Sequence, residues 1–266
     1  MSLTPYLVAL DIDGTTINHA GHLSPDVRAA VRAVADAGHH VVMATGRAIV
    51  GTVPILTTLG LTHGYAVCSN GAVTLRLDPA CRGGYEILEA VTFDPRPALE
   101  LLHGSWPDAA VAVEELGVGF KVSAPFPDGE LDGQVRVVPW EELGARPVTR
   151  LTFRSSTGTA ADFLALAERI GLHGFNYGVG YTAWLDINPE GVSKSAALEQ
   201  IRRRLRVEPT HTVAVGDQRN DLPMIRWAAR GVAMGNAPDE VKAAACEVTA
   251  DVDDDGLVPV LRSLLP

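Results

Sequence analysis

The pattern of apolar and polar positions divides this chain into three parts. Its two ends share one pattern, in which strands and helices alternate, and its middle has another. At the N-terminal end, short apolar runs are typical of buried strands. The strands predicted there are Tyr6–Leu10, Val41–Ala44 and Tyr65–Cys68. Between them, helical spacing predicts helices over Asp26–Ala37 and Ala48–Leu59, the first with Ser24 as its N-cap. Strands and helices therefore alternate at this end.

The C-terminal end repeats this alternation. Helices are predicted over Lys194–Leu205, Asp221–Ala229, Asp239–Ala245 and Leu257–Leu265. Strands are predicted over Thr212–Val215 and Gly231–Met234. Alternating strands and helices indicate a parallel sheet that is covered on both faces.

The middle of the chain has a different pattern of apolar and polar residues. Segments in which apolar and polar residues alternate predict antiparallel strands. These segments are Tyr85–Phe93, Ala110–Glu115, Gly119–Ser123, Val148–Arg154 and Tyr181–Ile187. Helices are predicted over Pro97–His103 and Ala160–Ile170, and a hairpin turn at Gly178–Gly180. We therefore predict an α/β fold: a doubly wound parallel-sheet, Rossmann-like core of residues 1–81 and 187–266, with an inserted α+β cap of residues 82–186.

Composition narrows the class of protein. With 47% hydrophobic and 20% charged residues, the 266-residue chain has the balance of a folded globular protein. Its formal net charge of −10 argues against a nucleic-acid binder, because phosphate backbones require a basic surface. No apolar stretch of about 18 residues predicts a membrane span. The first residues lack the basic region of a signal peptide. Three cysteines without a CxxC pair fit a reducing compartment, so we expect a cytoplasmic protein without membrane or nucleic-acid partners.

Polar residues and glycines follow the predicted strands at five places. In open α/β sheets, ligands bind outside the carboxyl ends of the strands, so these clusters are expected to line one rim. The five clusters are Asp11–Thr15, Thr45–Arg47, Cys68–Gly71, Gly216–Asp221 and Gly235–Asn236.

Asp11 and Asp13 are the first candidates for chemistry. They are two residues apart just past a strand, so both can face one site while Ile12 turns away. Carboxylates that share a site repel one another and require a cation, and carboxylate oxygens suit Mg²⁺. The alternative is an aspartate pair that only forms a turn. Asp217 and Asp221 at another strand end favour the metal site.

Four motifs in this order resemble the haloacid dehalogenase (HAD) superfamily of phosphotransferases. They are DIDGT at Asp11–Thr15, ATGR at Ala44–Arg47, the pair Lys194-Ser195 at a helix start, and GDQRND at Gly216–Asp221. The insert follows ATGR and the SNGA segment and precedes the lysine, which resembles the Cof-type branch with a type IIB cap. Four motifs at matching strand ends are far more specific than any one of them.

The resemblance implies a role for each aspartate. Asp11 would attack phosphorus and form an aspartyl phosphate. Asp13 would be the general acid for the leaving oxygen and then the base for the hydrolytic water. Mg²⁺ would bind a carboxylate oxygen of Asp11, the backbone carbonyl of Asp13 and the side chain of Asp217. Asp221 would be either a metal ligand or a partner of one.

The resemblance also implies contacts to the substrate. The expected phosphate-binding residues are Thr45, Gly46, Lys194 and Asn220. The expected substrate-binding residues are Arg47, Asn70 and Gly71. Each has a purely structural alternative: a Thr-Gly turn, a solvent-exposed lysine, a helix cap at Asn220, and an Asn-Gly turn.

These observations lead to one expected function and two alternatives. We expect a Mg²⁺-dependent phosphatase that hydrolyses a small phosphomonoester, such as a sugar phosphate or similar metabolite, as a monomer or homodimer. The acid/base group at Asp13 favours hydrolysis over the first alternative, a phosphomutase or phosphotransferase of the same superfamily. The second alternative is a non-catalytic sensor of a phosphorylated ligand, which would not need a nucleophile.

Overall fold

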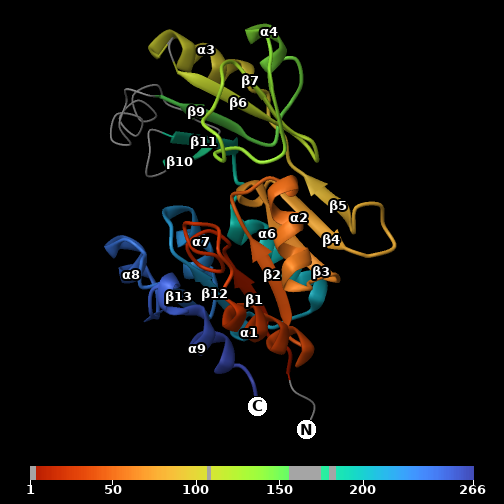
Figure 1. The fold of residues 1–266 in the computed structure, drawn as a ribbon, viewed down its shortest axis with the longest axis vertical. Helices are drawn as coiled ribbons and strands as arrows, with labels where there is room; N and C mark the ends of the chain where they lie inside the picture. The colour runs from red at the N-terminus through yellow and green to blue at the C-terminus, as the bar shows by residue number, and fades with distance from the viewer. Residues whose placement is uncertain (1–3, 107–108, 156–174, 180–183) are drawn as a thin grey trace. The chain divides into compact units, whose positions relative to one another are not determined.

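The computed structural model describes residues 4–106, 109–155, 175–179 and 184–266, which belong to two compact units (Figure 1). The first unit comprises residues 1–46, 53–89 and 193–266, and the second comprises residues 47–52 and 90–192. The divisions near 89 and 192 lie beyond the boundaries expected from the sequence, at 81 and 186, and residues 47–52 were expected in the core. Within the described residues, no helix has both the length and the apolar character needed to cross a membrane.

The first unit is built on an eight-stranded sheet in the described chain. Its spatial order is β14-β13-β12-β1-β2-β3-β4-β5. The strands are β1 (Leu7–Leu10), β2 (His40–Ala44), β3 (Gly64–Cys68), β4 (Val73–Leu77), β5 (Tyr85–Ala90), β12 (Thr212–Gly216), β13 (Arg230–Ala233) and β14 (Glu247–Val248). Neighbours from β14 to β3 pair in parallel, and β4 pairs antiparallel with β3.

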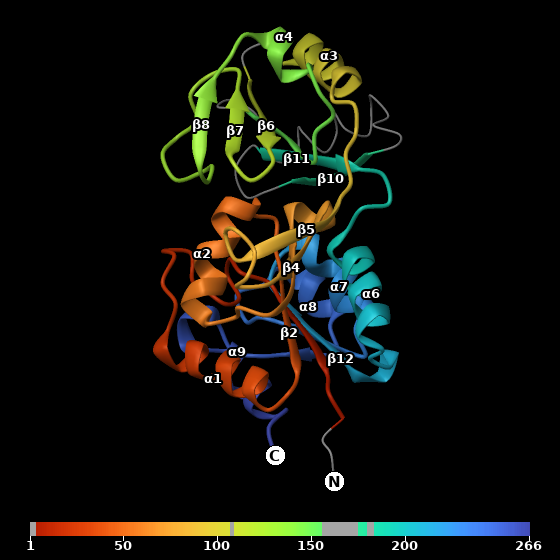
Figure 2. The same ribbon diagram turned by 90° about the vertical axis from the view of Figure 1, so that its right-hand side faces the viewer.

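Helices cover this sheet on both sides (Figure 2). They are α1 (Pro25–Asp36), α2 (Ile49–Leu59), α6 (Lys194–Leu205), α7 (Leu222–Trp227), α8 (Asp239–Ala244) and α9 (Leu257–Arg262). α1 packs against α9, and α6 packs against α7. Leu7 and Ala9 of β1 share a buried cluster with Leu198 and Ile201 of α6. The doubly wound α/β core predicted from the sequence is thus confirmed.

Parallel pairing decides where the strand-end residues go. Leu10, the last residue of β1, is aligned with Met43 of β2 and with Val215 of β12. Since these strands run in the same direction, the segments that follow them leave the sheet at one edge. The polar clusters after β1, β2, β3, β12 and β13 share that edge, as the strand alternation predicted.

The second unit contains a six-stranded sheet among its described residues, in the order β10-β11-β9-β6-β7-β8. The strands are β6 (Ala110–Glu115), β7 (Gly119–Val122), β8 (Gln134–Val137), β9 (Leu151–Arg154), β10 (Phe175–Val179) and β11 (Trp184–Pro189), and the helices are α3 (Arg96–Ser105) and α4 (Trp140–Leu143). Alternate residues such as Val111, Leu151 and Ile187 form a buried core with Leu99 and Leu102 of α3. This unit combines helices with a largely antiparallel sheet, which is the α+β character expected of the insert.

Several predictions for the middle of the chain were wrong in detail. The strand predicted over Tyr85–Phe93 is β5, which extends the first sheet instead of the insert's sheet. An alternating strand has the same pattern whichever sheet it joins. Gly178 and Val179, predicted in a turn, lie in β10 and pair with β11. The pattern also failed to predict β8 and α4 of the second unit, and β4 and β14 of the first. The helix predicted over Ala160–Ile170 lies outside the described residues.

Candidate active site

Asp11 is the residue directly after β1, and its side chain is buried. The chain turns sharply there: the Thr16 hydroxyl donates to the Asp11 carbonyl at 2.6 Å. Gly14 has a φ of +78°, and a β-carbon at this position would overlap the Asp217 carboxylate. Only glycine therefore lets the loop after β1 pass so close to Asp217.

Lys194 is the first residue of α6, and its side chain is fully buried. The Ser193 hydroxyl caps this helix by accepting from the Ala196 amide at 3.1 Å. The Lys194 ammonium donates to Oδ1 of Asp11 and to Oδ1 of Asp221, each at 2.6 Å. This geometry rules out the alternative of a solvent-exposed lysine.

Both oxygens of the buried Asp221 carboxylate are engaged. Oδ1 accepts from Lys194, and Oδ2 accepts from the backbone amides of Asp217 at 3.0 Å and Gln218 at 2.9 Å. A β-carbon at Gly216 would overlap this carboxylate, so the end of β12 must be glycine for the loop to close around it. Asp221 therefore ties the loop after β12 to the lysine of α6.

Asp217 is buried and is held by three neutral donors. Oδ1 accepts from the Thr15 hydroxyl at 3.1 Å. Oδ2 accepts from the Gln218 amide at 2.8 Å and from the Asn236 amide at 3.3 Å. The sequence alone predicts no side-chain role for Thr15, Gln218 or Asn236. Asn236 follows a strand end, but nothing in its spacing shows which carboxylate it contacts.

One oxygen from each of Asp11, Asp217 and Asp221 lies within 4.8 Å of the others, and all three residues are buried. Burial, and next the neighbouring Asp221, hold the pKa of Asp11 well above its usual value. The same two causes raise the pKa of Asp217 to about 6. Burial alone would lower the pKa of Lys194, but Asp11 and Asp221 outweigh it and raise that pKa, so the ammonium stays charged.

This arrangement fits a hard divalent cation. Three buried carboxylates face a single ammonium, which leaves an excess of negative charge in a place where charge is costly. Carboxylate and carbonyl oxygens are the donors that Mg²⁺ prefers. The side chain of Asp13 is outside this group of three. Asp13 is half-buried, and its backbone forms a β-bridge with Ile17.

The expected phosphate-binding residues after β2 and β12 lie together. Thr45 is buried, and its backbone carbonyl accepts a hydrogen bond from the backbone amide of Asn70 at 3.0 Å. The Asn220 side-chain amide donates to Oδ1 of Asn70 at 3.0 Å. A β-carbon at Gly46 would lie 3.0 Å from that same Asn70 oxygen. Asn70 thus bridges the two loops.

The turn after β3 has an unusual backbone. Ser69, Asn70 and Gly71 have φ values of 50°, 56° and 106°. Residues other than glycine rarely adopt positive φ values, so the backbone of this turn is strained at Ser69 and Asn70. A β-carbon at Gly71 would overlap the carbonyl of Ser193, which places the turn against the start of α6. Arg47, the remaining expected substrate contact, belongs to the second unit, where its Nη1 lies 3.6 Å from Oδ1 of Asp132.

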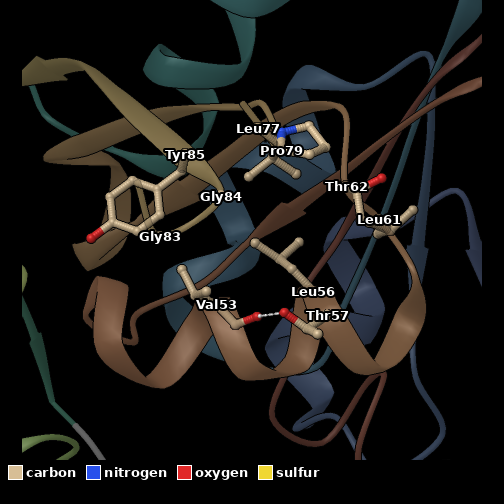
Figure 3. Close-up of a pocket in the computed structure, with 10 residues that line it drawn as sticks. All are labelled: Val53, Leu56, Thr57, Leu61, Thr62, Leu77, Pro79, Gly83, Gly84 and Tyr85. Carbon is tan, nitrogen blue, oxygen red and sulfur yellow. Dashed lines mark hydrogen bonds between the residues drawn. The ribbon is translucent and has the colours of Figure 1, made fainter. Parts of the chain in front are cut away.

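A separate small apolar pocket lies in the first unit (Figure 3). It is lined by α2 residues such as Val53 and Leu56 and by Leu77, Pro79 and Tyr85. None of the expected site residues lines it.

Known proteins are similar to this chain in sequence. A sequence profile described as haloacid dehalogenase-like hydrolase matches residues 8–87 and 158–261, more than half of the chain. Phosphatase YwpJ of Bacillus subtilis is 27% identical over 292 residues, covering 97% of this chain and 99% of that protein. The 5-amino-6-(5-phospho-D-ribitylamino)uracil phosphatase YcsE of the same organism is 25% identical, covering 96% and 94%.

One solved structure has a similar fold. It is the HAD subclass IIB sugar phosphatase BT4131, which matches with a TM-score of 0.82 and 24% identity over 97% of this chain and 98% of that one. At this identity the match establishes the fold alone.

Proposed function

Because this chain belongs to the haloacid dehalogenase-like hydrolase family, we propose that it is a Mg²⁺-dependent phosphatase that hydrolyses a small phosphomonoester through an aspartyl-phosphate intermediate. One observation carries the proposal: the buried Lys194 ammonium bonds both Asp11 and Asp221, with the Asp217 carboxylate in the same cluster. A non-catalytic scaffold has no need for so costly a concentration of buried charge.

Asp11 is the proposed nucleophile. A carboxylate attacks phosphorus only when ionised. Burial and Asp221 hold the pKa of Asp11 well above its usual value, whereas the Lys194 ammonium at 2.6 Å favours the ionised form, as a bound Mg²⁺ would. Attack transfers the phosphoryl group from the substrate's oxygen to a carboxylate oxygen of Asp11. Water then cleaves the resulting acyl phosphate, which splits one difficult step into two easier ones.

Asp13 is the proposed acid and base. Ile12 between the two aspartates is fully buried, so Asp11 and Asp13 flank a fixed point of the backbone. Asp13 would protonate the leaving oxygen in the first step and accept a proton from the hydrolytic water in the second. Asp13 is half-buried, so solvent can reach it, and its charge is close enough to Asp11 to raise the pKa of that carboxyl.

We propose that Asp11, Asp217 and the backbone carbonyl of Asp13 hold the Mg²⁺. A bound Mg²⁺ would offset the charge of the phosphoryl oxygens as they approach an anionic nucleophile. Asp221 is better suited to a different task, since its two oxygens already accept from Lys194 and from two backbone amides. We therefore assign Asp221 to holding Lys194 in position.

The phosphoryl group would bind between the loops after β2 and β12. The hydroxyl of Thr45, the amide of Gly46, the side chain of Asn220 and the Lys194 ammonium are its proposed donors. Charge in phosphoryl transfer spreads over three oxygens, so several fixed donors are more effective than one. We propose Arg47, Asn70 and Gly71 as the neighbours of the rest of the substrate.

For the substrate we propose a small polyhydroxylated phosphomonoester, such as a sugar phosphate. Support comes from the names of two similar proteins, a 5-amino-6-(5-phospho-D-ribitylamino)uracil phosphatase and a sugar phosphatase. We further propose a cytoplasmic enzyme that acts as a monomer or homodimer.

The test is a screen of about one hundred phosphorylated metabolites for phosphate release, with Mg²⁺ and with a chelator. We expect turnover that requires Mg²⁺ and is abolished in Asp11→Asn, while the circular dichroism spectrum of this variant stays unchanged. Isomerised sugar phosphate without free phosphate would instead identify a phosphotransferase. No turnover on the whole panel, together with tight ligand binding by calorimetry, would identify a sensor.

A further inference from the structure

Asn236, which follows β13, makes three hydrogen bonds that join separate parts of the first unit. Its amide nitrogen donates to the Gly14 carbonyl at 2.9 Å and to Oδ2 of Asp217 at 3.3 Å. Its carbonyl oxygen accepts from the Val252 amide at 3.0 Å. The side chain thus connects the loop after β1, the loop after β12 and the loop before α9.

These partners determine which way the Asn236 amide faces. A carboxylate and a carbonyl can only accept, and a backbone amide can only donate, so the nitrogen must face Asp217 and Gly14. Both hydrogens of the nitrogen have separate acceptors. An asparagine satisfies all three partners at once, whereas an alanine or a serine does not.

The contact of Asn236 with Asp217 matters because no charged group among the described residues is hydrogen-bonded to this carboxylate. Its described hydrogen-bond donors are Thr15, Gln218 and Asn236, and all three are neutral. They fix the direction of the carboxylate, whereas the Lys194 ammonium acts on its charge without a hydrogen bond. Asp217 therefore presents a negative charge of fixed direction beside Asp11 and Asp221.

We propose that Asn236 is a positioning residue: it orients the Asp217 carboxylate, and with it the backbone after Asp13, for divalent-cation binding. This inference rests on the proposed function. Thr15 and Gln218 belong to the two loops that flank the site, whereas Asn236 approaches from a third strand end and is itself anchored to Val252. Asn236 therefore fixes the two loops relative to each other.

The test compares Asn236→Ala with a matched control, Asn18→Ala. Asn18 also donates from its amide to a carboxylate, Oδ1 of Asp253 at 2.9 Å, and accepts from backbone amides, but on the exposed surface. The main readout is Mn²⁺ binding to the substrate-free protein, followed by electron paramagnetic resonance. Substitution of a residue that orients a metal ligand typically lowers metal affinity by about 10- to 100-fold.

We expect Asn236→Ala to weaken Mn²⁺ binding by about 10- to 100-fold and Asn18→Ala to change it less than about twofold. The phosphatase activity of Asn236→Ala should recover as the Mg²⁺ concentration is raised, since a site of lower affinity is occupied at a higher concentration of the ion. A lowered melting temperature with unchanged Mn²⁺ affinity of the folded variant would assign Asn236 a merely structural role and overturn the proposal.

Two provisions keep the test decisive. If Asn236→Ala does not fold, Asn236→Ser retains a polar group but can donate to only one of the two acceptors, so it should show the same loss of Mn²⁺ affinity. Mn²⁺ binding needs no substrate. Wild-type protein that binds Mn²⁺ but hydrolyses no phosphomonoester would therefore refute the proposed function while leaving the role of Asn236 measurable.

Discussion

The ammonium nitrogen of Lys194 lies 2.6 Å from Oδ1 of Asp11, although 183 residues separate the two in the chain. The whole insert lies between them in sequence. The contact forms because β1 carries Asp11 to one edge of the sheet, and because α6 begins at that edge with Lys194 as its first residue. A cation at a helix N-terminus is unfavourable for the helix dipole, so the buried carboxylates must compensate for it.

Replacing this lysine should therefore affect both activity and stability. In Lys194→Met, Asp11 and Asp221 lose their shared cation, and we expect kcat to fall at least about 100-fold. Breaking a buried ion pair from one side costs about 3 to 5 kcal/mol of unfolding free energy. Phosphate release and urea unfolding at pH 7 measure the two effects. The control Lys242→Met, on α8, should change neither, and a Lys194→Met enzyme within tenfold of wild-type activity would refute the assigned role.

Mg²⁺ should stabilise the folded protein through Asp217. At a concentration of 100 times its dissociation constant, a ligand of the native state adds about 2.7 kcal/mol to the unfolding free energy. We expect Asp217→Asn to lose this gain and Asp13→Asn to retain it, since the proposed ligand at Asp13 is the backbone carbonyl. Thermal unfolding with Mg²⁺ and with a chelator measures the difference. Loss of the gain in Asp13→Asn would show that its side chain binds the metal.

The turn after β3 should tolerate no side chain at Gly71. Its φ is +106°, and a β-carbon there would overlap the Ser193 carbonyl at the start of α6. Gly21 offers a matched control, with a φ of +78° and no atom within 4 Å of an added β-carbon. We expect Gly71→Ala to cost about 2 to 4 kcal/mol and Gly21→Ala about 1 kcal/mol, measured by urea unfolding. Equal costs would mean that the contact with Ser193 is unimportant.

Glu199 should make stability depend on pH. Hydrogen bonds from Arg202, Trp227 and Arg203, against the opposing effect of burial, lower the pKa of Glu199 to about 2. A carboxylate whose folded pKa is depressed stabilises the protein above its unfolded pKa, and this stabilisation is lost as pH falls through the folded pKa. The loss therefore falls between about pH 4.5 and pH 2.

The variant Glu199→Gln measures this effect. Because Glu199 is partly solvent-exposed, we expect the Glu199→Gln variant to be only about 1 to 2 kcal/mol less stable than wild type at pH 7, with the difference vanishing near pH 2. Urea unfolding across this pH range measures the difference in unfolding free energy. Glu86→Gln is the control: Glu86 also pairs with an arginine, Arg76, but both side chains are about half exposed at 50% and 45%, so its effect should stay below about 0.5 kcal/mol. A pH-independent difference would contradict the assignment.

Much of the core could be read from local pattern. The helix predicted over Lys194–Leu205 has these same bounds in the structure, and the Ser24 cap forms as predicted, since its hydroxyl accepts from the Asp26 amide at 3.2 Å. Such features depend on residues close in the chain. The strand β5 shows the limit, because its alternation marks it as a strand without indicating which sheet it joins.

The motifs likewise identified Asp11, Asp217, Asp221 and Lys194 as candidates, and parallel alternation predicted a common edge. Tertiary structure decided their partners. It placed Lys194 between two carboxylates instead of in solvent, engaged both oxygens of Asp221, and brought Asn236 to Asp217. The physical reason is one of range: side-chain periodicity and capping act over a few residues, whereas hydrogen bonds between loops depend on where several strands end in space.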